Sequence, residues 1–210
     1  MASSPPHSYT LEIFSDQHLV RDLAKGILHT IFFHRYFPSI RPSLTTDTSL
    51  PIPLPCILDP PEIAAAIDTS VAELMSQLNT PSGPGNVPPG GSRGEIVVQF
   101  FDRKRRKTGY TGGWLGRLGG GGAQTDEEVC WEEWRLKVVV ARPRSEADRI
   151  KVRRAMESSL QKTALKIVDL VNKEKDHIPP ITTSEQNPFP YRMLVNPKQQ
   201  NLEKGFGGWS

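Results

Sequence analysis

The sequence has little of what most catalytic and metal-binding sites require. Its 210 residues include two cysteines, Cys56 and Cys130, and neither lies in a CxxC pair or another metal-ligand spacing. This usage argues against a disulfide framework and favours a reducing compartment. The P-loop pattern, the GxGxxG fingerprint and the GxSxG nucleophile motif are also absent. We therefore expect a protein that is not an enzyme, with no catalytic residues, no metal and no cofactor.

Strong charge and long apolar runs are missing as well. The formal net charge is +3, which is mild beside the clustered basic surfaces of nucleic-acid binders, so we expect no nucleic acid partner. No segment approaches the roughly 18 apolar residues of a membrane span, and the start MASSPPHSY has no charged region followed by an apolar run. The sequence predicts a cytoplasmic location.

Hydrophobic periodicity is present and predicts seven elements. An alternating pattern indicates strands at 8–14, 95–103, 131–142 and 189–195, and apolar stripes at helical spacing indicate helices at 16–37, 59–78 and 145–176. Ser15 or Asp16 is placed to cap the first helix, and Ser145 to cap the third. This order predicts an α+β fold in which three helices pack on one face of an antiparallel sheet. Residues 8–195 would form a single domain.

Three segments are too poor in apolar residues to form packed structure. Residues 80–94 are rich in Pro, Gly and Ser and predict a disordered linker inside the domain. Residues 104–129 predict a long glycine-rich loop that joins two strands as a protruding connection. Residues 196–210 predict a flexible tail.

Trp114 lies inside the loop segment GYTGGWLGRLGGGG, where no regular element is expected. A large apolar side chain on such a backbone is either a plug that folds onto the core or a side chain exposed for a partner. A Trp packed onto the core needs ordered apolar neighbours, but the only apolar residues near Trp114 in the sequence are Leu115 and Leu118. The pattern therefore favours exposure of Trp114 and Leu115 as a small hydrophobic contact.

The loop begins with the strongest basic run of the chain, which is Arg103, Lys104, Arg105, Arg106 and Lys107. A basic cluster beside an aromatic residue fits a peripheral membrane module that binds anionic lipid, which we keep as the alternative function. The simpler reading is a solvated strand end that discourages edge pairing.

Four other residues invite a functional reading. His29 and His34 are five residues apart, which separates them by about 140° on a helix, whereas two ligands of one metal need a spacing of three or four residues, so we expect no shared metal. They are expected on the helix surface or facing a partner. Trp131 and Trp134 would point to opposite sides of an alternating strand.

Several stretches together resemble the autophagy-related protein 101 family. They are GILHTIFFHR in the first helix, VQFFDRKRRK and CWEEWRLKVVV on strands, KIVDLVNKEKDHIPP at the end of the last helix, and PYRML. The resemblance covers most of the chain from about Leu11 to Val195. It implies a HORMA-like fold and a non-catalytic subunit of the autophagy-initiation kinase complex, recruited to the phagophore assembly site.

The resemblance also implies a partner and a recruitment site. Family members pair with the HORMA domain of autophagy-related protein 13 and carry a Trp and Phe finger in the loop between two central strands. Carried onto this sequence, the finger is Trp114, followed by Leu115 and Gly116 where other members have Pro and Phe. From the broad apolar stripe of the first helix, we expect the partner interface at Phe32, Phe33, His34 and Arg35.

Overall fold

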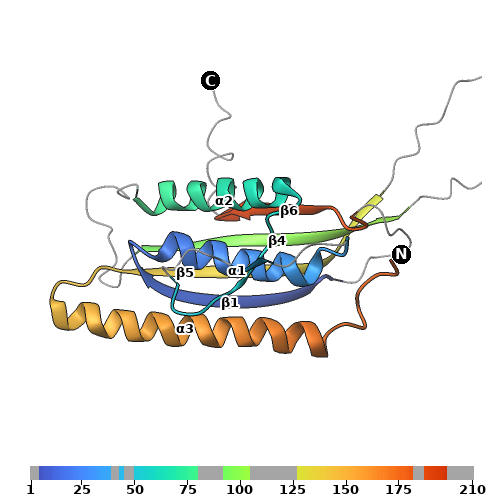
Figure 1. Ribbon diagram of the computed structural model, residues 1–210. Helices are drawn as coiled ribbons and strands as arrows, with labels where there is room; N and C mark the ends of the chain where they lie inside the picture. Colours follow the sequence, from blue (N-terminus) through green and yellow to red (C-terminus); the bar gives the residue numbers. More distant parts are fainter. Residues whose placement is uncertain are drawn as a thin grey trace, which may run out of the picture.

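The computed structural model describes residues 5–38, 43–44, 50–79, 92–104, 127–181 and 187–197. The chain runs β1 (His7–Asp16), α1 (Val20–Arg35), β2 (Ser43–Leu44), β3 (Pro55–Cys56), α2 (Pro61–Asn79), β4 (Ser92–Lys104), β5 (Glu127–Ala141), α3 (Glu146–Lys173) and β6 (Tyr191–Val195). Figure 1 shows the helices layered against the long strands. The α+β class and the three predicted helices are confirmed.

The main sheet has the strand order β1-β5-β4-β6. β4 pairs antiparallel with both β5 and β6, whereas β1 pairs parallel with β5 along its whole length, from His7 opposite Glu132 to Asp16 opposite Ala141. The sheet is therefore mixed, and the prediction of a purely antiparallel sheet is wrong for β1. Parallel neighbours need a long crossover connection, and α1, α2 and β4 all lie between β1 and β5 in the chain.

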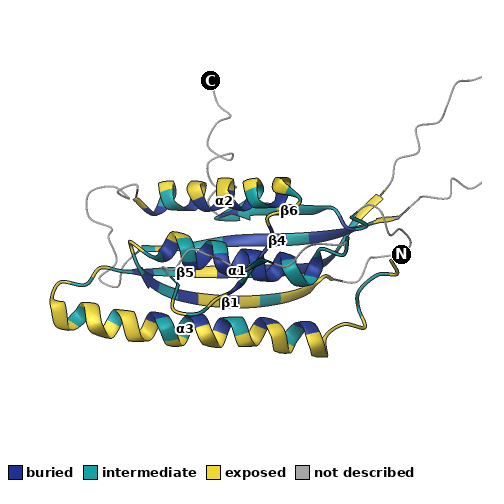
Figure 2. Ribbon diagram, in the orientation of Figure 1, coloured by how far each residue is buried: buried dark blue, intermediate teal, exposed yellow. Residues whose placement is uncertain are grey.

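All three helices contribute to a single core on one face of the sheet. α1 crosses the middle of this face and contacts β1 and β5, α2 covers β4 and β6, and α3 runs beside β1. The burial pattern follows this arrangement, with α1 mostly buried and the outer side of α3 exposed (Figure 2). The largest fully buried side chains include Trp134, Phe32 and Phe100.

Local sequence explains where α1 begins and how closely it is covered. Asp16 Oδ1 accepts the backbone N–H groups of His18 and Leu19 in the turn before α1. The N-cap residue is Leu19, which has no side-chain cap, so the predicted cap at Ser15 or Asp16 is wrong. Further along, Gly26 lies under the segment before β3, and a Cβ at this position would stand 2.8 Å from Leu54 Cδ1. The missing side chain lets this segment pack directly on the helix.

α3 combines a side-chain cap with an unusual attachment to the sheet. The Ser145 hydroxyl accepts the N–H of Asp148 at 3.1 Å, as predicted for the cap. Along the free edge of β1, Thr163 Oγ1 and Lys166 Nζ each donate to a strand carbonyl at 2.8 Å, those of Glu12 and Thr10. Side chains of α3 thus satisfy backbone acceptors at this edge that have no neighbouring strand.

The strand ends differ from the predicted segment boundaries. β4 begins at Ser92, so the last three residues of the predicted linker 80–94 belong to a strand, and residues 80–91 lie outside the described part. β5 begins at Glu127, so the predicted loop 104–129 loses residues at both ends to paired strands. Cross-strand pairing extends each strand beyond its apolar stretch. β2 and β3 form a two-residue antiparallel pair, with Ser43 opposite Cys56 and Leu44 opposite Pro55.

Candidate partner-binding site

The paired ends of β4 and β5 bring the predicted basic loop to one end of the molecule. The register continues to Lys104 opposite Glu127, so residues 105–126 connect two neighbouring strand ends. Arg103 is exposed, and its Nε lies 3.7 Å from Glu128 Oε1. Glu128 also accepts from Arg192 Nη2 at 2.6 Å. Glu128 is therefore shared by Arg103 of the basic run and Arg192 of β6.

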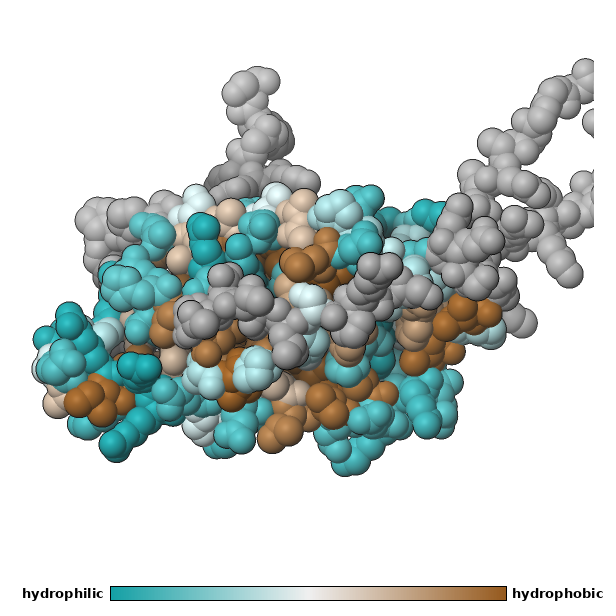
Figure 3. Space-filling model, viewed as in Figure 1, coloured by the Kyte–Doolittle hydropathy of each residue, from teal (hydrophilic) through white to brown (hydrophobic). Residues whose placement is uncertain are grey.

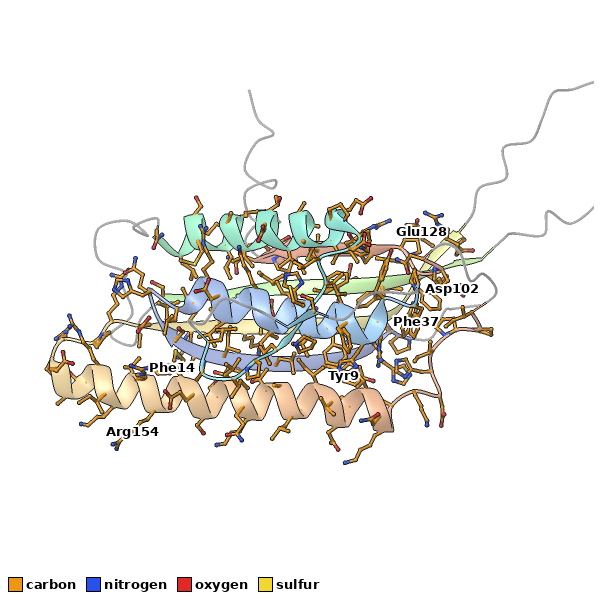
Figure 4. All side chains as sticks on the ribbon, viewed as in Figure 1. Tyr9, Phe14, Phe37, Asp102, Glu128 and Arg154 are labelled. Carbon is orange, nitrogen blue, oxygen red and sulfur yellow. The ribbon has the colours of Figure 1, made fainter. Side chains whose placement is uncertain are left out.

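The predicted recruitment finger is not among the described residues. Trp114 and Leu115 both lie outside them, as do Arg105, Arg106 and Lys107. Their roles stay predictions. The structure does place the two strand ends that carry this segment, and Figure 4 shows Asp102 and Glu128 together at that end of the molecule.

The four residues predicted as a partner interface divide into two groups. Phe33 and His34 are half-buried, whereas Phe32 is 0% exposed and Arg35 is 2% exposed. Phe32 packs edge-on against Phe100 and Tyr191 inside the core. The interface assignment is therefore wrong for Phe32 and Arg35, because the first packs in the core and the second forms an internal ion pair. Burial, and then the charge of Arg35, lowers the pKa of His34 below the usual 6.5.

Arg35 belongs to a buried polar cluster centred on Glu132. The Glu132 carboxylate is completely buried and accepts Arg35 Nε at 2.7 Å and the indole N–H of Trp134. Its second oxygen lies 2.7 Å from Nε2 of His177, which follows α3. The cluster therefore ties α1, β5 and the segment after α3 together. A buried charge of this kind is stabilised by an opposite charge and by hydrogen-bond donors close to it.

A β-bulge explains why two tryptophans lie on the same face. The register shifts between Phe100 and Phe101, so Trp131 and Glu132 both stand opposite Phe100. Trp131 then packs against Phe189 with a centroid distance of 5.0 Å. Trp131 and Trp134 both belong to the core cluster, and the prediction that they face opposite sides is wrong.

Burial also shifts the pKa values of His29 and Tyr9. His29 is 6% exposed and its Nδ1 accepts the N–H of Ile57 at 3.3 Å, so its expected place on the helix surface is wrong. Burial lowers the pKa of His29 below 6.5, which keeps the ring neutral as an acceptor requires. Burial and the nearby Glu132 charge raise the pKa of Tyr9 to about 12.

Sequence reasoning missed Glu132 and His177. Glu132 has the same strand parity as Trp134 and Leu136, which face the core. That parity was the available signal for a buried carboxylate. His177 lies in no regular element and offered no comparable signal. Among the residues that the structure describes, no three His, Cys, Asp or Glu side chains converge as metal ligands, and no described helix is long and apolar enough to cross a membrane.

Three helices on one face of a four-stranded mixed sheet, with a long hairpin at one end, form a HORMA-like α+β domain. The family model described as Autophagy-related protein 101 matches residues 12–185. The chain therefore belongs to the autophagy-related protein 101 family. Similar proteins include Autophagy-related protein 101 of Arabidopsis thaliana, 23% identical over 77% of this chain and 74% of the relative. Autophagy-related protein 101 of Schizosaccharomyces pombe is 24% identical over 90% of this chain and 86% of the relative.

Family membership defines the function in outline. The family is a non-catalytic one of the autophagy machinery, so the expectation that the chain is not an enzyme is confirmed. Membership also implies that the chain is a subunit of the autophagy-initiation complex.

Proposed function

We propose that the chain is an adaptor that pairs with the HORMA domain of autophagy-related protein 13 and recruits downstream factors through Trp114 and Leu115. Family membership supports the partner class. The single observation that supports the recruitment site is the β4–β5 ladder. It continues to Lys104 and Glu127 and so presents residues 105–126 from two adjacent strand ends. In the cell, the protein would be cytoplasmic and would move to the phagophore assembly site with its complex.

The interface with the partner would include the exposed parts of Phe33 and His34 at the end of α1. Their rings contact each other edge to face at a centroid distance of 5.3 Å, and both remain half-buried in the isolated chain. Aromatic side chains that retain exposed area on a rigid helix lose little entropy on binding. This location is next to the buried Arg35, which fixes the helix end.

The partner test uses Phe33→Ser with His34→Asp in the full chain. Co-purification with the HORMA domain of autophagy-related protein 13 should fall while the circular dichroism spectrum is unchanged. Leu165→Ser with Val168→Ser is the matched control, because both side chains are exposed on the outer side of α3. Equal binding by both variants would move the interface away from α1.

The recruitment test replaces Trp114 with Ala. An exposed Trp contributes about 0.5 kcal/mol or less to the stability of the chain, so the melting temperature and the pairing with autophagy-related protein 13 should not change. Recruitment of downstream autophagy factors in cells should be lost. An unfolded variant would mean that Trp114 plugs the core and is not a binding residue.

The alternative is binding of anionic lipid by the same loop. Flotation with vesicles that contain phosphatidylserine distinguishes the two functions. Replacement of Arg105, Arg106 and Lys107 by Ser should leave downstream recruitment unaffected if the finger acts on a protein. Loss of both flotation and recruitment in this variant would favour the membrane module.

A further inference from the structure

A hollow of about 860 Å³ lies at the opposite end of the molecule from the β4–β5 hairpin. It opens where β1 leads into α1 and where β5 leads into α3. The first turns of α3 extend past the end of β1 and form one wall (Figure 1). None of the proposed partner-binding residues lines it.

Three arginines line this hollow, namely Arg142, Arg149 and Arg153. Arg142 Nη2 donates to Ser92 Oγ at 3.4 Å, and Arg153 Nε donates to Glu157 at 3.4 Å. These contacts are long, and each guanidinium has five N–H donors, so most of the donor capacity faces water.

Two carboxylates also line the hollow, and both already have partners. Asp16 Oδ1 accepts the backbone N–H groups of His18 and Leu19 at 2.9 and 3.0 Å. Glu146 Oε2 accepts Arg149 Nη1 at 3.3 Å. Three arginines against two carboxylates leave the lining with a formal net charge of +1.

The surrounding sequence amplifies this charge. Residues 142–154 contain six arginines and lysines and two acidic residues, a net charge of +4, whereas the whole chain carries +3. Four of these cations, Arg149, Lys151, Arg153 and Arg154, lie within the first turns of α3, where like charges three and four residues apart repel one another. An anionic partner would relieve this repulsion. Figure 4 shows one of these side chains, Arg154, extending away from the domain.

Apolar side chains lie among the arginines. Ile150 is 50% exposed although it lies on the lining of the hollow, and Leu19 and Pro143 are only partly buried beside it. The lining therefore offers an apolar surface surrounded by guanidinium groups. Arginine clusters of this kind recognise acidic motifs, because the planar fork binds carboxylates in a bidentate way.

We infer that this arginine-lined hollow binds an acidic peptide segment of a partner protein that also carries an apolar side chain. The carboxylates would pair with Arg149 and Arg153, and the apolar side chain would cover Ile150. The concave shape favours a peptide over a bilayer, since a flat lipid surface would reach the rim of the hollow and leave its lining uncovered.

The test measures fluorescence anisotropy of a labelled peptide, Glu-Glu-Leu-Glu-Glu-Leu-Glu-Glu, with the full chain at low ionic strength. Arg149→Glu with Arg153→Glu should weaken binding about tenfold or more, because two charge-assisted contacts become repulsive. Acidic residues suit the start of a helix, so this variant is expected to fold. Lys162→Glu with Lys175→Glu is the control. It changes the net charge equally at exposed sites outside the hollow.

Two further measurements test the apolar contact and the class of partner. Ile150→Ser should reduce the affinity for the leucine peptide to that for an all-glutamate peptide, about threefold to tenfold. Vesicles containing phosphatidylserine should bind weakly and equally to both charge-reversed variants. The inference is overturned by undetectable peptide binding, by equal losses in the two charge variants, or by vesicle binding that depends on Arg149 and Arg153 while peptide binding does not.

Discussion

The two ends of the domain hold arginine side chains in opposite ways. At the end of α1, Arg35 is 2% exposed and its Nε lies 2.7 Å from the fully buried Glu132. At the start of α3, the Arg149 side chain is 69% exposed and lies 3.3 Å from Glu146, which is 76% exposed. The first pair joins α1 to β5 inside the fold. The second leaves the arginine available for other partners.

This difference follows from solvation. A buried ion pair has lost its water, so removal of the oppositely charged partner leaves an uncompensated charge. An exposed pair exchanges its partner for water at almost no cost. Figure 3 shows apolar residues over the middle of this face of the molecule and hydrophilic residues along the outer side of α3.

The largest expected effect is that of Glu132→Ala. This substitution leaves Arg35 buried without its acidic partner, so the free energy of unfolding should fall by about 3–5 kcal/mol. Urea denaturation of the full chain measures it. Glu128→Ala is the control, because this residue pairs with arginines at an exposed strand end and should cost less than about 1 kcal/mol. Similar losses in the two variants would contradict the comparison.

A smaller effect is expected for His177→Ala. The ring accounts for one of the three contacts of Glu132 and stacks on His7 at a centroid distance of 4.1 Å. The loss should lower the free energy of unfolding by about 1–3 kcal/mol, because Arg35 and Trp134 still satisfy the carboxylate. Hydrogen exchange should also accelerate in β6 more than in α2. Unchanged exchange in β6 would show that the contact between His177 and Glu132 does not stabilise this strand.

The burial of His29 should make the free energy of unfolding depend on pH. Its pKa is lowered in the folded chain, so the folded state binds fewer protons than the unfolded state below about pH 6.5. Stability should therefore be complete above this pH and fall as the pH is lowered. His29→Gln should flatten the loss of unfolding free energy between about pH 7 and pH 5.

The smallest effect on stability is expected at the exposed end. Arg149→Glu with Arg153→Glu should change the free energy of unfolding by about 0.5 kcal/mol or less, because both pairs are exposed and local to α3. Thermal melting of the full chain measures it. A large loss would mean that these arginines support the fold, and the comparison of the two ends would fail.

The predicted partner interface on α1 shows what a hydrophobic pattern cannot determine. The apolar stripe of α1 correctly indicated a helix with a broad buried face. It could not show that Phe32 and Arg35 are buried whereas Phe33 and His34 keep exposed area. Segment 50–57 and strand β5 decide which side of α1 is covered, through contacts such as Leu54 on Gly26 and Glu132 with Arg35. Neither contact is local in sequence.

By itself, the sequence determined the α+β class, the three helices, the cap at Ser145 and the long β4–β5 connection, because periodicity and capping are local properties. Only the tertiary structure decided that β1 lies parallel to β5, that a bulge turns Trp131 inward and that Glu132 is buried. These features depend on which distant segments become neighbours, and burial then sets the energetic value of each charge. The same residue type is therefore a structural anchor at position 35 and an exposed cation at position 149.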